Sequence, residues 1–425
     1  MSDYFDRVEA QIVRNVEAGL PHGSRRPNVS GYLAIAAAAL IVIVVAGAFL
    51  LARGSSPTAP PAASHSITLK FKATAIGSKT PSGRVLDSAV PILRERLGSV
   101  YPGVHVSRAE NEIVVTAPNA NAGTRAAILT LVKTRAYLAF YDWEANVIAP
   151  NGKTVATQLQ TQDPTAVEIS QGDGSVAPGQ PWAGSMNLYD AVTLASKQPR
   201  SESPDNSRIT DQYYMFGAPG SAACAAAAKA SGTVASAGQH CLLNGPYDSK
   251  HALLTGLPAG VSASDGQILV VPRGIVVLQA IPQNFSKPTP IADPSAQFFV
   301  LKDDIALTGS DITNPQQRTD PNIGSPDVTF GFTSKGKTEF QAVTANLAHR
   351  GNLVSSTGMT FNQHFAVALD NELITVPYVD FRQYPDGING DKGADIAGSF
   401  TLSFARDLAT ILRYGPLPVE LTARG

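Results

Sequence analysis

The sequence lacks an excess of positive charge. Its 425 residues include 33 Lys and Arg against 34 Asp and Glu, which gives a formal net charge of -1. Nucleic-acid binding needs a basic surface that neutralises phosphates, so the composition argues against a nucleic-acid partner. Charged residues make up only 16% of the chain and hydrophobic residues 44%, which is enough for a sizeable folded core.

Signatures of catalysis and metal binding are missing as well. Neither the zinc-protease motif H-E-x-x-H nor the serine-hydrolase motif G-x-S-x-G occurs. The histidines are scattered along the chain, at positions 22, 65, 105, 240, 251, 349 and 364. We therefore expect no enzymatic activity, no cofactor and no metal, and we interpret the carboxylates of Asp303, Asp304 and Asp386 as solvated loop groups.

Long hydrophobic runs are rare, and one stands out. Residues 31–52 (GYLAIAAAALIVIVVAGAFLLA) contain no charged side chain over 22 positions. At about 1.5 Å per residue, such a helix crosses the roughly 30 Å hydrocarbon core of a bilayer. A buried soluble helix needs no apolar residues on every face, and a cleaved signal peptide has a shorter apolar region nearer the start. We predict an uncleaved transmembrane helix.

The flanking segments predict the orientation of this helix. Arg25 and Arg26 precede the run, whereas only Arg53 follows it before Lys70. Basic residues favour the cytoplasmic side, so the N-terminus is expected inside and the main domain extracytoplasmic. Residues 1–30 would form a cytoplasmic tail with an amphipathic helix. The Pro- and Ser-rich residues 53–65 would form a linker.

Cysteine is nearly absent from the sequence. Cys224 and Cys241 are the two that occur, and they flank a stretch rich in Ala, Ser and Gly. An extracytoplasmic domain is exposed to oxidising conditions, which favours a disulfide between them. Two unpaired cysteines packed as small hydrophobic residues are an alternative, and a metal site has only His240 as a nearby ligand.

Residues 66–142 show the clearest pattern of helices and strands. ITLKFKATA, VHVSR, EIVVTAP and YLAFYDW have the composition of strands, while GRVLDSAVPILRERLGSVY and TRAAILTLVKTRA have helical periodicity. The order β-α-β-β-α-β is typical of a ferredoxin-like unit, in which two helices cover one face of an antiparallel sheet.

Residues 145–325 are rich in Pro, Gly, Ser and Asn, and their pattern is weak. The segment ILVVPRGIVVLQAI at 268–281 is predicted to form a hairpin that turns at Arg273-Gly274. Much of the remaining sequence in this range is expected to form loops.

Residues 326–425 become regular again. PDVTFGF and PLPVELT are predicted strands, and KTEFQAVTANLAHRG and FTLSFARDLATILRYG are predicted helices. HFAVALDNELITVPYV is predicted to form a hairpin that turns at Asp370-Asn371, a residue pair suited to the left-handed conformation of a tight turn.

This last stretch resembles the extracytoplasmic domain of SecD, a subunit of the bacterial protein-export machinery. The resemblance is carried by VTFGFTSKGKTEFQAVT, FAVALDNELITVPYV, IAGSFTLSFARDLATILRYG and LPVEL, which follow the family's order and spacing. ILRERL, EIVVTAP and AYLAFYD fit the family too, so the resemblance covers residues 66–142 and 326–422. The residues that match the family motifs are Leu369, Asp370, Pro377, Gly398, Phe400, Gly415, Leu417 and Pro418.

The resemblance implies an α+β fold with two parts beyond the transmembrane helix. Residues 66–144 would form a ferredoxin-like base that is completed by a strand at 416–422. Residues 145–415 would form a SecD-like head inserted between these base segments.

The resemblance also implies a function in protein export across the bacterial cytoplasmic membrane. The expected partners are translocating or unfolded polypeptide, Sec translocon subunits and, through the single helix, membrane lipid. The sequence ends at Gly425, where the second membrane helix of the family would begin, so we expect a single-pass protein without proton-coupling helices. The alternative is a structural or regulatory membrane protein that uses the same fold to bind other partners.

A phosphate-binding motif points to a different function. Residues 331–338 (GFTSKGKT) match G-x-x-x-x-G-K-T between a predicted strand and a predicted helix. However, the match coincides with the glycine turn of the SecD pattern, and Asp370 lies in a hairpin turn, whereas a magnesium-binding Asp ends a core strand. We therefore expect no bound nucleotide.

Overall fold

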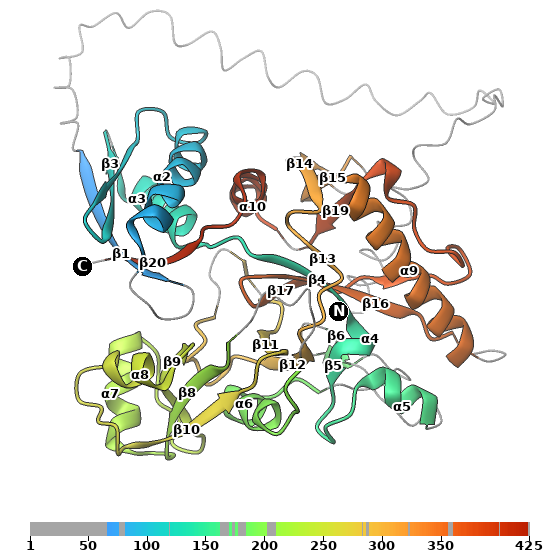
Figure 1. Cartoon of the computed structure of the whole chain (residues 1–425), viewed down its shortest axis with the longest axis horizontal. Coiled ribbons are helices and arrows are strands. Elements are labelled where there is room, and N and C mark those ends of the chain that lie inside the picture. Colours follow the sequence, from blue (N-terminus) through green and yellow to red (C-terminus); the bar gives the residue numbers. More distant parts are fainter. Residues whose placement is uncertain are drawn as a thin grey trace, which may run out of the picture.

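The computed structural model describes residues 66–75, 81–118, 120–161, 170–171, 175–176, 184–201, 210–282, 284–285, 289–321, 324–355, 360–398 and 400–423. The predicted cytoplasmic tail, transmembrane helix and linker lie outside these ranges. No helix in the described ranges is long and apolar enough to span a bilayer. The described chain is a mixed α+β structure (Figure 1).

A four-stranded antiparallel sheet in the order β2-β3-β1-β20 contains both the first and the last strand of the described chain. Buried and exposed side chains alternate along its strands, because one face of the sheet packs on helices. Phe71 is fully buried, whereas its neighbours Lys70 and Lys72 are exposed. The elements of this part are β1 (Ile67–Ala75), α2 (Gly83–Gly98), β2 (His105–Ala109), β3 (Glu112–Ala117), α3 (Ala122–Lys133) and β20 (Val419–Ala423).

The fourth strand of this sheet differs from the strand expected from the β-α-β-β-α-β order. The predicted strand at 137–143 is β4 (Leu138–Asp142), which pairs with β13 and β16 in another sheet. Strand β20 takes the place beside β1. The physical reason is burial. Side chains of β4 are buried on both faces, which suits a covered central strand, whereas β20 alternates buried and exposed residues and suits a sheet with one open face.

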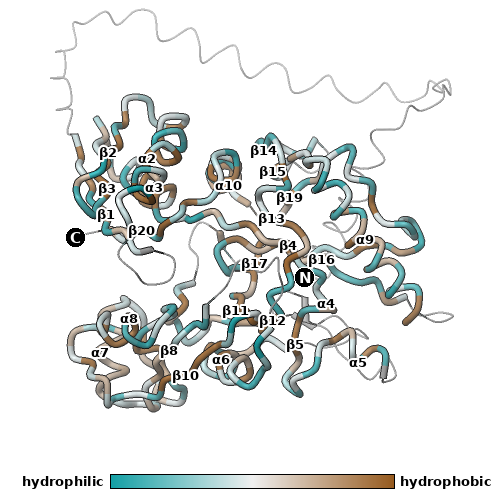
Figure 2. Tube along the Cα trace, in the orientation of Figure 1, coloured by the Kyte–Doolittle hydropathy of each residue, from teal (hydrophilic) through white to brown (hydrophobic). Residues whose placement is uncertain are grey.

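An eight-stranded sheet forms the centre of the molecule, with the order β13-β4-β16-β17-β11-β12-β5 and β18 paired to β16. All seven side chains of β16 are buried, and hydrophobic colours concentrate in the central strands in Figure 2. The strands are β4, β5 (Val147–Ile148), β11 (Ile275–Gln279), β12 (Phe298–Lys302), β13 (Leu307–Thr308), β16 (Gln363–Leu369), β17 (Glu372–Thr375) and β18 (Tyr378–Val379).

The predicted turn at Asp370-Asn371 connects β16 to β17. Both residues have positive φ, 50° and 74°, as the sequence pair indicates. One of the three loop carboxylates was interpreted wrongly. Asp304 and Asp386 are exposed, but Asp303 is only 1% exposed and accepts a hydrogen bond from the Tyr141 hydroxyl.

Residues 210–271 form a smaller unit around a three-stranded sheet in the order β10-β8-β9. The predicted hairpin at 268–281 is wrong, because β10 pairs with β8 while β11 pairs with β12 in the central sheet. The chain therefore passes from one sheet to the other at Arg273-Gly274. The elements here are β8 (Gln212–Gly217), α7 (Ala222–Ser231), β9 (Cys241–Tyr247), α8 (Lys250–Thr255) and β10 (Gly266–Val271).

A further three-stranded sheet, ordered β14-β15-β19, lies beside the longest helix, α9 (Figure 1). Its elements and their neighbours are β14 (Ile312–Thr319), β15 (Pro326–Phe332), α9 (Ser334–Val354), η2 (Gly390–Lys392), β19 (Ala394–Ala397) and α10 (Leu402–Tyr414). Short elements complete the described chain: α4 (Trp143–Asn146), α5 (Val155–Thr161), β6 (Ser170–Gln171), β7 (Ser175–Val176) and α6 (Leu188–Ser196).

Candidate functional site

Five phenylalanines form a closed ring where the central sheet meets the β14-β15-β19 sheet and α9. They are Phe140 of β4, Phe330 and Phe332 of β15, Phe340 of α9 and Phe365 of β16. Going around the ring from Phe140 to Phe330, Phe332, Phe340, Phe365 and back, the centroid distances are 6.3, 5.4, 4.7, 5.6 and 5.5 Å. These separations are typical of favourable aromatic pairs.

Local structure explains why these side chains converge. Phe330 and Phe332 are two positions apart on a strand, so they lie on the same face of β15. Thr333 ends the strand and caps α9 by accepting a hydrogen bond from the Gly336 amide. The helix then turns back over the central sheet, which brings Phe340 against Phe332 and Phe365.

The phenylalanine ring lines an apolar cavity of about 130 Å³. In another protein, an apolar cavity of about 150 Å³ holds one benzene molecule, so the space here suits one aromatic side chain. The cavity lining also includes Thr375, Pro377 and Tyr378 of the 365–379 hairpin, together with Lys392 and Asp395. These five residues are half-buried or exposed, so the cavity opens at the surface.

The β14-β15-β19 sheet carries a buried carboxylate on its other face. Asp327 of β15 is 3% exposed, and its Oδ1 has no hydrogen-bond partner in the described part of the chain. Burial raises the pKa of Asp327 to about 6, with a further increase from the nearby Asp395 carboxylate, while Arg318 opposes the shift. The sheet that borders the cavity thus carries, on the face turned away from the phenylalanine ring, a carboxyl group whose pKa is raised.

We expect the replacement Asp327→Asn to stabilise the fold above pH 6 by about 1–2 kcal/mol. The folded pKa lies above the unfolded value, so the folded state binds the proton more tightly. Stability therefore falls as the pH rises from about 4 to about 6, and the variant lacks this loss. Urea unfolding at pH 3.5 and pH 7.5 measures the difference. Asp304→Asn, an exposed control, should change neither value, and equal effects of Asp327→Asn at both pH values would contradict the assignment.

The family-motif residue Asp370 lies where the chain passes from α3 into the central sheet. Its carboxylate accepts hydrogen bonds from the amides of Ala136 at 3.1 Å and Tyr137 at 2.7 Å. The Asp370 amide donates to the Tyr137 carbonyl at 3.0 Å. Asp370 therefore fixes the hairpin turn to the connecting segment, which is a structural role and not a magnesium-binding one.

A second contact joins the same connecting segment to the chain that returns into β20. Leu417, another motif residue, donates its amide to the Arg135 carbonyl at 2.7 Å. Gly415 has a φ of 79°, a conformation that favours glycine, and its carbonyl accepts a hydrogen bond from Arg96 at 2.5 Å. Arg96 of α2 is fully buried and also donates to the carbonyls of Leu131, Thr134 and Arg135.

The remaining motif residues are dispersed through the head. Pro377 lines the cavity mouth, and Leu369 is buried in β16 opposite Leu138. Phe400 is buried against Phe285, with ring centroids 4.9 Å apart, and a Cβ on Gly398 would lie 2.7 Å from the Phe400 ring. The half-buried Pro418 immediately precedes β20. The motif thus marks mainly the framework, with Pro377 as the member that contacts the cavity.

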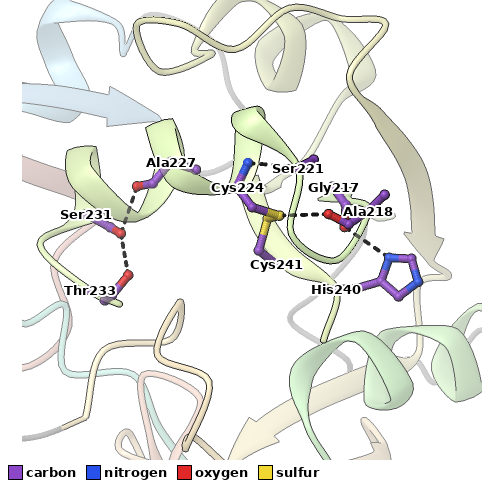
Figure 3. Close-up of a disulfide and its surroundings, with 9 residues drawn as sticks. All are labelled: Gly217, Ala218, Ser221, Cys224, Ala227, Ser231, Thr233, His240 and Cys241. Atoms are coloured by element: carbon purple, nitrogen blue, oxygen red, sulfur yellow. Dashed lines mark hydrogen bonds between the residues drawn. A yellow bond between two sulfur atoms is a disulfide. The ribbon is translucent and has the colours of Figure 1, made fainter. Parts of the chain in front are cut away.

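The predicted disulfide is confirmed. Cys224 of α7 and Cys241 at the start of β9 are bonded with a Cα–Cα distance of 5.7 Å (Figure 3). His240 Nδ1 lies 3.0 Å from the Gly217 carbonyl, and its ring stacks on Tyr189. In the described ranges no group of three or more His, Cys, Asp or Glu residues is arranged to hold a metal ion.

Reduction of this disulfide is expected to destabilise the 210–271 unit by about 3 kcal/mol. The bond closes a loop between residues 17 positions apart, and its loss gives the unfolded chain more conformational freedom. Thermal unfolding with and without a phosphine reductant measures the loss. The Cys224→Ala/Cys241→Ala double variant, which has nothing to reduce, should be insensitive to the reductant. Full thiol labelling of the unreduced protein would contradict the bond.

The phosphate-binding motif at 331–338 is engaged in protein contacts. Lys337 pairs with Asp391 at 2.9 Å, and Lys335 pairs with Glu339 at 2.9 Å. A Cβ on Gly336 would lie 2.2 Å from the Asp311 carbonyl oxygen, so a neighbouring backbone segment already covers the start of the helix. The glycine is explained by this close approach, and the lack of nucleotide binding stays a prediction.

Comparisons with known proteins match parts of this chain. The family model of the SecDF P1 head subdomain matches residues 285–419. Protein translocase subunit SecD of Elusimicrobium minutum is 31% identical over 124 residues, which is 29% of this chain and 22% of the relative. The Streptomyces coelicolor subunit SecD is 36% identical over 92 residues, 22% of this chain and 14% of the relative. The chain thus spans about a fifth or less of these relatives.

A solved structure of SecDF, described as a membrane component that enhances protein export, covers 84% of this chain and 98% of its own. Its sequence identity is 16% and its TM-score is 0.38. At that level the structural likeness carries no argument, so the family assignment depends on the sequence matches.

Proposed function

We propose that the protein assists export across the bacterial cytoplasmic membrane by binding translocating polypeptide with a SecD-family extracytoplasmic domain. The match of residues 285–419 to the SecDF P1 head subdomain supports this proposal. In this proposal the β2-β3-β1-β20 sheet with α2 and α3 forms the base, the part of the chain between α3 and β20 forms the head, and the helix predicted at 31–52 anchors both. Sec translocon subunits would be further partners. The observation that carries the proposal is the five-phenylalanine cavity, whose ring residues other than Phe140 lie within the matched segment.

The cavity supports polypeptide binding for an energetic reason. The cavity has an apolar lining and opens at the surface. An apolar side chain of a client that enters it removes apolar surface of both partners from water, which favours binding. An unfolded client loses chain freedom when it binds, so we expect weak affinity and little dependence on sequence outside the contacting side chain.

The disulfide supports the extracytoplasmic placement. Disulfides persist in oxidising compartments and are rare in the cytosol, so Cys224–Cys241 fits a domain outside the cytoplasm. With the helix at 31–52 as the anchor, the N-terminus would then lie inside, as the flanking arginines predict.

A site-specific crosslink tests the proposal. The full-length protein in lipid nanodiscs would carry a photoreactive amino acid in place of Tyr378 at the cavity mouth, or in place of Tyr101 near the base as a control. We expect a reduced, unfolded exported protein to be captured at position 378 and not at 101, and its folded form at neither. In cells, the same probe should capture translocon components. Capture of a cytoplasmic partner by residues 1–20, with no client at 378, would favour the regulatory alternative.

A further inference from the structure

The strand that borders the cavity is also the edge of its sheet. In the order β14-β15-β19, strand β19 pairs with β15 along one side, from Asp327–Ala397 to Phe330–Ala394. In an antiparallel strand, alternate backbone N–H and C=O groups point away from the partner. Within the described part of the chain, no further strand pairs with the outer side of β19, and end strands are the sites where extended segments add to sheets.

The register of β19 connects this edge to the phenylalanine ring. Residues directly opposite each other in a sheet lie on the same face. Ala394 is opposite Phe330 and Ile396 is opposite Val328, so both share the face that carries Phe330. A further strand added beside β19, with a residue opposite Ala394, would place that residue's side chain on the cavity face.

The surroundings of the mouth fit an extended chain of mixed composition. Besides β19, the cavity is lined by Thr375, Pro377 and Tyr378, and Tyr378 belongs to the two-residue strand β18. The rim has one cationic and one anionic side chain, Lys392 and Asp395. Such a rim selects for neither sign of charge. The specificity of the site then comes from the apolar cavity and from backbone pairing.

We propose that a client binds as a short extended segment that adds to the outer edge of β19 and inserts one aromatic side chain into the five-phenylalanine cavity. This proposal depends on the proposed function and specifies its substrate class. The segment carries an aromatic residue, has extended neighbours on both sides and contains no proline where an N–H must reach β19. Side chains two positions away lie on the same face outside the cavity, and the intervening ones lie on the opposite face of the sheet.

Peptide variants test this binding mode without altering the protein. The full-length protein in nanodiscs would be titrated with a fluorescent peptide Thr-Ser-Thr-Phe-Thr-Ser-Thr. Replacing Phe by Ala should weaken binding at least about tenfold, because the aromatic ring is the part that fills the cavity. Methylating backbone nitrogens at alternate positions should weaken binding about tenfold for one of the two alternating sets and less than about twofold for the other, because only one set faces β19.

The outcomes separate the binding mode from the proposed function. Equal effects of both methylated sets, with loss of binding for the Phe→Ala peptide, would overturn strand addition while client binding in the cavity stands. If one methylated set weakens binding more than the other but the Phe→Ala peptide binds as well as the original, insertion into the cavity would be overturned. If the peptide does not bind while a reduced, unfolded exported protein is captured at position 378, the binding mode alone fails. If neither is bound, the proposed function fails with it.

Discussion

Replacing Ala394 by Phe is expected to weaken the binding of unfolded polypeptide at least about tenfold without lowering the free energy of unfolding. Ala394 lines the cavity and lies opposite Phe330, so the new ring projects into the space of about 130 Å³. It would occupy the position that a client side chain needs. Because it fills an apolar void and meets other phenylalanines, it should leave stability unchanged or increase it.

The measurement is a titration of the full-length protein with a reduced, unfolded exported protein, combined with urea unfolding of the same samples. Ala126→Phe is the matched control, because Ala126 lies exposed on α3 in the base, away from the ring. It introduces the same side chain and should change binding less than about twofold. Unchanged client affinity in a folded Ala394→Phe protein would remove the cavity from the proposed function.

The sequence predicted elements whose residues interact with near neighbours. The turn at Asp370-Asn371 and the helices at 83–98 and 402–414 have local signals, namely turn residues and helical periodicity. It did not predict which sheet a strand joins. The segment at 137–143 could pair with the base or with the head, and its burial on both faces becomes visible only when the neighbouring strands are in place.

The candidate site shows the same limit. Of the ring residues, Phe330, Phe332 and Phe340 stand close together, and their positions at i, i+2 and i+10 could have marked one side of the cavity. Phe140 and Phe365 come from strands far apart in the chain, so the closed ring depends on the pairing of β4 with β16. Asp303 was interpreted as solvated because its partner, Tyr141, is 162 positions away.

Arg96 is a comparable case, because no local sequence pattern distinguishes it from the other arginines. It lies on α2, yet its side chain is fully buried. It donates hydrogen bonds to backbone carbonyls of the segment after α3 and of the segment before β20. Burial lowers the pKa of Arg96 to about 10, while the Asp370 carboxylate opposes the shift. The guanidinium stays charged at neutral pH, so each contact is a charge-assisted hydrogen bond.

Replacing Arg96 by Met is therefore expected to lower the free energy of unfolding by about 3 kcal/mol or more. Methionine matches the aliphatic part of the side chain but leaves the carbonyls of Leu131, Thr134, Arg135 and Gly415 without this donor. Leu131 lies in the last turn of α3, Thr134 and Arg135 belong to the segment that leaves it, and Gly415 belongs to the segment that returns to β20. The substitution thus loosens both connections between the β1–β20 sheet and the rest of the molecule.

Urea unfolding of the full-length protein measures the effect, with Arg108→Met as the matched control. Arg108 makes an exposed ion pair with Asp87 at 3.0 Å, and loss of such a pair should cost less than about 1 kcal/mol. A small and equal loss for both variants would contradict the structural role of Arg96. A large loss confined to Arg96→Met would support the stabilisation of the segment after α3 and the segment before β20 by the buried Arg96 side chain of α2.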